Sequence, residues 1–189
     1  MDIFEYVSVL TSIIVGLGIA HLLRGVVRLI QHPGRHPVYW VHLGWVANMF
    51  LSLVFFWWWE FNLGGIERWT FTVYLFVLCY AVLLFMISAL LFPEDLSGYE
   101  GYREYFHARR RWFFGLQALT FPIDVVDTMI KGSGHVTGLG SEYLPAMFIQ
   151  FSLAIFAMFI RNERFHQVLV VAFLAYQLSW ALRMFGTVA

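Results

Sequence analysis

Long apolar runs, separated by short polar connections, constrain this chain more than any other feature of its sequence. Five runs carry almost no charge and a sixth contains charged residues, all within 189 residues. Each run is close to the roughly 20 residues that an α-helix needs to cross about 30 Å of hydrocarbon. We therefore expect six transmembrane helices, at 3–23, 38–59, 69–92, 112–131, 143–160 and 166–186.

The composition excludes a soluble fold. Apolar residues make up 60% of the chain and charged residues only 13%, with a mean hydropathy of +0.70. That leaves too little polar surface to cover a soluble domain. The runs are continuous rather than alternating, which favours helices over a β-barrel. The sequence thus predicts an all-α membrane protein whose residues 1–189 form one integral membrane domain.

Basic residues are distributed unevenly between the two sides of the predicted bundle. Most of them flank the connections that join spans one and two, three and four, and five and six. By the positive-inside rule these connections are cytoplasmic, which places both termini on the outer side of a plasma (bacterial inner) membrane. The basic residues of this cytoplasmic set are Arg24, Arg28, Arg35, Arg103, Arg109, Arg110, Arg111, Arg161 and Arg164, against Arg68, Lys131 and Arg183 on the other side.

Short matches between the two halves suggest an internal duplication. A unit of three helices would then occur twice in opposite orientations, as in many transporter folds, with a binding site near the midplane between the copies. Sequences this rich in Phe, Leu and Val also match by chance, so both interpretations stay open. The halves are residues 1–93 and 100–189, in which Glu5-Tyr6 matches Glu104-Tyr105 and Gly16-Leu17 matches Gly115-Leu116.

The fourth and sixth predicted spans contain three charged residues short of their ends. Asp124 and Asp127 lie in the fourth span, three residues apart and so on one helix face. A carboxylate at that depth costs several kcal/mol unless it is paired, protonated or facing water. Arg183 comes out at similar depth in the sixth span and is the expected partner. A fixed salt bridge, a fourth helix that lies partly in the interface, and an ion-binding carboxylate are the three interpretations.

Uncharged polar groups occur at a similar depth in other spans. We single out Asn48, Gln117 and Gln177, which come from the second, fourth and sixth spans. Each alone is typical of an interhelical hydrogen bond. As a set, they could line a narrow polar path that leads to the aspartates.

Two further groups of residues have binding interpretations. His21, Arg24 and Arg28 form a stripe at helical spacing, which fits either side chains that extend to the interface or an anionic lipid head-group site. His21, His42 and His166 could supply the two facing imidazoles of a haem, although no cofactor or metal is expected. The motifs of metalloproteases, serine hydrolases and nucleotide-binding enzymes are missing from the sequence, and nothing in it indicates an enzyme or nucleic-acid binding.

The leading hypothesis is a small membrane protein that transports an ion or small solute between its two halves. Asp124 would be the ion or proton site, with Asp127 also among the binding residues. Arg183 would tune the charge of Asp124, and the amides would line the path. The alternative is a non-enzymatic accessory or sensor subunit that binds a lipid, a quinone or a partner protein. In either case we expect a homo-oligomer or a complex with another membrane protein.

Overall fold

A computed structural model of the chain describes residues 3–34, 36–66 and 69–185. Within these ranges the regular structure consists of seven α-helices and one short 3-10 helix, with no strand. The all-helical prediction is therefore confirmed. The helices are α1 (Ile3–Gln31), α2 (Trp40–Trp59), η1 (Glu60–Gly65), α3 (Phe71–Leu91), α4 (Tyr102–Ile130), α5 (Ser133–Gly138), α6 (Tyr143–Phe159) and α7 (Glu163–Phe185).

Five of the helices are long and apolar enough to cross a membrane, where the sequence predicted six spans. The sixth apolar helix, α6, has only 17 residues. Helices α1 and α4 are longer than the predicted spans, with 29 residues each. Arginine is a good helix former, so the helices continue through basic segments such as 103–111. The hydropathy pattern therefore underestimated the lengths of these two helices.

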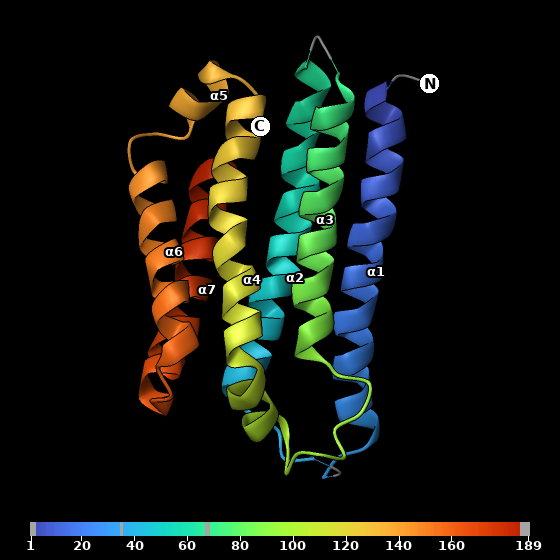
Figure 1. Ribbon diagram of the computed structural model, residues 1–189, viewed down its shortest axis with the longest axis vertical. Helices are drawn as coiled ribbons and strands as arrows, with labels where there is room; N and C mark the ends of the chain where they lie inside the picture. Colours follow the sequence, from blue (N-terminus) through green and yellow to red (C-terminus); the bar gives the residue numbers. More distant parts are fainter. Residues whose placement is uncertain (1–2, 35, 67–68, 186–189) are drawn as a thin grey trace.

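The long helices stand side by side with short connections at two ends (Figure 1). Helix α3 lies between α1 and α4, and α6 packs on the other side of α4. Helix α2 is central, since it contacts α1, α3, α4 and α7. Helix α4 runs lengthwise beside its neighbours in this bundle, so within the described residues it does not lie across one end of the molecule (Figure 1).

The two ends of the bundle differ in their connections. The connections α1–α2, α3–α4 and α6–α7 lie together at one end, which we call the arginine-rich end (Figure 1). The opposite end carries η1 and α5 together with the N- and C-terminal markers, and we call it the α5 end (Figure 1). Helices α2, α4 and α7 all start at the arginine-rich end and run in the same direction.

The helix contacts of the two halves are not alike. Helix α1 packs most extensively against α3, the third helix of its half. Helix α4, its counterpart in the second half, packs most extensively against α6, the second long helix of that half. The duplication of residues 1–93 in 100–189 therefore stays a prediction.

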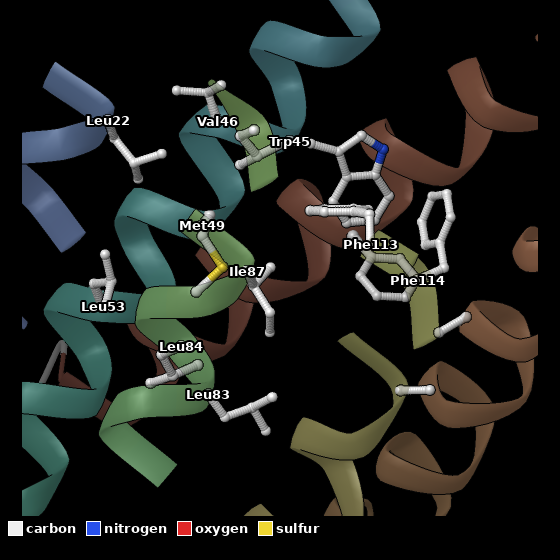
Figure 2. Packing of buried hydrophobic residues seen from close by; sticks show 14 of the residues in the cluster. Leu22, Trp45, Val46, Met49, Leu53, Leu83, Leu84, Ile87, Phe113 and Phe114 are labelled. Carbon is white, nitrogen blue, oxygen red and sulfur yellow. The ribbon is translucent and has the colours of Figure 1, made fainter. Parts of the chain in front are cut away.

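A cluster of aromatic rings fills the centre of the bundle between α2, α4 and α7. The indole of Trp45 lies 5.1–5.3 Å, centroid to centroid, from the rings of Phe113, Phe114 and Phe173. Figure 2 shows Trp45 packed against Phe113 and Phe114, beside the aliphatic contact of α2 with α3. All four rings are buried. We call Trp45, Phe113, Phe114 and Phe173 the aromatic layer.

Candidate functional site

Three polar side chains stand one helical turn above the aromatic layer, toward the α5 end. Asn48 follows Trp45 by three residues, Gln117 follows Phe114 by three, and Gln177 follows Phe173 by four. Since α2, α4 and α7 run in the same direction, these spacings place all three amides on the same side of the rings. We call Asn48, Gln117 and Gln177 the amide layer.

Hydrogen bonds tie two members of the amide layer together. Asn48 Nδ2 donates to Gln177 Oε1 at 2.8 Å, and Gln177 Nε2 donates to Ser52 Oγ at 2.9 Å. Ser52 Oγ in turn donates to the carbonyl oxygen of Asn48 at 3.0 Å. This network joins α2 to α7, and it determines the orientation of the Asn48 and Gln177 amides.

A second polar layer, closer to the α5 end, contains an ammonium held between two carboxylates. Lys131 Nζ donates to Glu60 Oε1 at 2.7 Å and also to Asp127 Oδ2. The exposed fraction of the side chain is 0% for Lys131, 1% for Asp127 and 9% for Glu60. Asp127 and Lys131 share one face of α4 because they are four residues apart. Glu60 reaches them because α2 ends at Trp59, directly beside the end of α4.

Asp124 is the third carboxylate of this layer, and two tyrosines hold it. Tyr80 Oη donates to Asp124 Oδ1 at 3.2 Å, and Tyr143 Oη donates to Asp124 Oδ2 at 2.7 Å. Tyr143 also lies 2.9 Å from Thr128 Oγ1. Because Tyr143 donates to the carboxylate, its oxygen accepts from Thr128. The contacts join α3, α4 and α6, and we call Glu60, Asp124 and Asp127 the carboxylate layer.

Both layers line one cavity of about 190 Å³. All three carboxylates and all three amides face it, and the rest of its wall is largely aromatic, with Trp59, Tyr143, Tyr176 and Trp180 among the lining residues. Phe173 belongs both to this wall and to the aromatic layer. The aromatic layer therefore lies between the cavity and the arginine-rich end.

Some oxygen atoms of the site are buried without a hydrogen-bond partner. Among the described residues, Glu60 Oε2 and Asp127 Oδ1 have none, and neither does the side-chain oxygen of Gln117. Ionised carboxylate oxygens can only accept hydrogen bonds. Leaving such groups buried and unpaired costs free energy, so their presence beside a cavity indicates a place for a donor.

The carboxyl groups of the site outnumber its cationic groups. Of the described residues in and around the carboxylate layer, three are carboxylates and one, Lys131, carries an ammonium. His135 lies close by in α5, where its ring packs 5.3 Å from that of Trp59. Burial lowers the pKa of His135 and the Lys131 ammonium lowers it further, whereas the Asp127 carboxylate raises it. With all three carboxylates ionised, the site has a surplus of negative charge.

Five of the residues singled out in the sequence line this cavity, and Arg183 does not. Asn48, Gln117, Asp124, Asp127 and Gln177 come together as expected. The expected pairing of Arg183 with Asp124 or Asp127 is wrong. Its guanidinium pairs with the exposed carboxylate of Glu142 and lies 5.5 Å from the ring centroid of Trp180.

Helical phase explains this error. Gln177 and Ala181 both face the cavity and are four residues apart. Arg183 follows Gln177 by six residues, which turns it about 240° around α7 and away from the cavity. Depth along the helix was the basis of the prediction, and depth does not determine which way a side chain points.

Sequence reasoning missed the partners that complete the site. Lys131 entered the sequence analysis only as a basic residue of the outer side, although the spacing of four from Asp127 to Lys131 was a usable signal for an ion pair. Glu60 and Tyr80 were not among the predicted site residues. No sequence pattern pointed to Tyr143, because its role depends on how α6 packs against α4.

The histidine predictions concern the arginine-rich half of the bundle. Each of the three candidate haem ligands donates Nε2 to a backbone carbonyl: His21 to Phe92 at 3.0 Å, His42 to Leu91 at 2.6 Å and His166 to Ile160 at 2.9 Å. Each Nε2 is therefore engaged in a hydrogen bond in this structure, and a haem at these residues stays a prediction. Arg24 and Arg28 are exposed, and a head-group site at these two residues stays a prediction.

The arrangement is suited to binding a positively charged, hydrogen-bond-donating ligand. Acceptor oxygens, a surplus of carboxylates and aromatic faces all attract cations.

Comparison of the chain with protein-family models, with curated proteins and with solved structures finds no match.

Proposed function

We propose that this chain is an integral membrane protein of the plasma membrane that binds a small cation in the cavity and carries it across the bilayer. The five long apolar helices support the membrane location, with α6 as a shorter sixth span. The arginines at one end support a cytoplasmic position for that end. The cavity would then open toward the outer half of the membrane.

One observation carries the proposal: the surplus of buried carboxylates around a cavity. Glu60, Asp124 and Asp127 face the same space, and among the described residues that surround it Lys131 supplies one ammonium, which pairs with Glu60 and Asp127. Buried carboxylates that served only to join helices would be expected in balanced pairs, because each unpaired charge destabilises the fold. A transported cation that binds and leaves explains a site that is incomplete without it.

The position of the aromatic layer favours a carrier over an open channel. Trp45, Phe113, Phe114 and Phe173 are buried and packed against one another between the cavity and the arginine-rich end. A cation that enters from the α5 end meets these rings after the amide layer. Passage therefore requires that α2, α4 and α7 move relative to one another, as in alternating access.

Flux through proteoliposomes tests the proposal. We expect uptake of protons or of a small cation by the wild type, and its loss in Asp124→Asn, which removes a charge from the cavity without changing its size. Glu142→Gln is the matched control, since Glu142 lies at the same end but faces Arg183 outside the cavity. Equal flux in wild type and Asp124→Asn would contradict the proposed role of this carboxylate.

The accessory-subunit hypothesis is the second candidate, and the hydrogen-bond network supports it. Asp124 has two tyrosine donors and Asp127 has Lys131, so both carboxylates also hold helices together. In that case Asp124→Asn would lower the thermal unfolding midpoint, and no cation would cross in any variant.

A further inference from the structure

The side chain of Lys131 provides an internal example of a ligand in the carboxylate layer. Its ammonium is fully buried and donates to a carboxylate from η1 and another from α4. The four methylene groups of lysine followed by the ammonium are equivalent to n-butylammonium. The carboxylate layer therefore already accommodates a primary alkylammonium group.

The remaining oxygen atoms of the same two carboxylates are suited to a further N–H donor. Glu60 Oε2 and Asp127 Oδ1 are buried and, among the described residues, have no donor. Ionised carboxylate oxygens form short, strong hydrogen bonds with the N–H groups of an ammonium ion. The two unpaired oxygens are therefore suited to such a donor.

The walls of the cavity are suited to the carbon skeleton of an amine. Trp59, Tyr143, Tyr176 and Trp180 present aromatic surface to the cavity. Such rings attract an organic cation and shield its methylene groups from water. At about 190 Å³, the cavity has room for several water-sized groups, and so for a short alkyl chain.

We infer, on the basis of the proposed cation binding, that the ligand of this cavity is a small organic amine in its primary ammonium form. Lys131 competes with this ligand for Asp127 and Glu60. The ammonium ion enters beside Asp124, and its N–H groups bind the carboxylate oxygens that Lys131 leaves unpaired. Lys131 keeps the site stable when no ligand is present, and it is partly displaced when an amine binds.

The thermal unfolding midpoint of the purified full chain in nanodiscs tests this inference, with n-butylammonium chloride as the probe. Sodium chloride at equal ionic strength and n-butanol are the control compounds. We expect n-butylammonium alone to raise the midpoint of the wild type, because a ligand that binds the folded state stabilises it. Lys131→Met, which keeps the length of the side chain without its charge, should bind the probe about tenfold more tightly. Arg183→Met, at the same end but outside the cavity, should behave as the wild type.

If Lys131→Met does not fold, Asp124→Asn takes its place, and the midpoint shift caused by n-butylammonium should fall while Arg183→Met retains it. A shift no larger than that from sodium chloride would overturn the inference, as would equal affinity in Lys131→Met and wild type. If proton or sodium flux depends on Asp124 but n-butylammonium does not bind, the amine assignment fails while the proposed function stands. If neither flux nor binding occurs, both fail.

Discussion

The two ends of the bundle use charged residues in opposite ways. At the arginine-rich end the ion pair between Arg103 and Glu163 is exposed, with 65% and 35% of the two side chains accessible. At the α5 end, Lys131 and Asp127 form an ion pair that is almost completely buried. Solvent and salt screen exposed charges, so these attract one another only weakly, whereas buried charges depend on specific partners. The comparison shows that the burial of an ion pair, rather than the number of charges at an end, determines how much the pair contributes to stability.

Removal of the buried ammonium should have the largest effect. Lys131→Met leaves Glu60 and Asp127 buried without their shared donor, so we expect the free energy of unfolding in detergent micelles to fall by about 3–5 kcal/mol. Combining it with Asp127→Asn should recover part of the loss. A loss below about 1 kcal/mol would mean that the ammonium is effectively solvated, and the two ends would then be alike.

A smaller effect is expected from the hydroxyl that holds Asp124. Tyr143→Phe removes a hydrogen bond to a charged group, and we expect a loss of about 1.5–3 kcal/mol in the same unfolding measurement. Tyr176→Phe is the matched control, since the Tyr176 hydroxyl borders the same cavity and has no hydrogen-bond partner within the described part of the chain. Equal losses in both variants would show that Asp124 does not depend on Tyr143.

The smallest effect should come from the exposed ion pair at the arginine-rich end. Arg103→Gln removes one partner of Glu163, and we expect the free energy of unfolding to change by about 0–1 kcal/mol, and by less still at high salt. Unfolding curves at low and high salt check both points. A loss as large as that of Lys131→Met would contradict the contrast between the ends.

The apolar periodicity of the sequence determined the elements of this fold. A long apolar segment inside hydrocarbon has no water to bond its backbone groups. An α-helix is then the stable form, because it pairs these groups within the segment. The same reasoning identified Asp124, Asp127 and the amides Asn48, Gln117 and Gln177, since polar groups among so many apolar ones require a partner. These inferences concern local composition, and they did not need the packing.

Only the tertiary structure decided which of these groups meet. The helical phase of α7 turns Arg183 away from the aspartates, and the end of α2 brings Glu60 to Lys131 instead. The packing of α6 against α4 adds Tyr143, and the convergence of α2, α4 and α7 builds the aromatic layer below the cavity. The sequence alone indicated that the buried charges need partners, but the choice of partner depends on how helices far apart in the chain face one another.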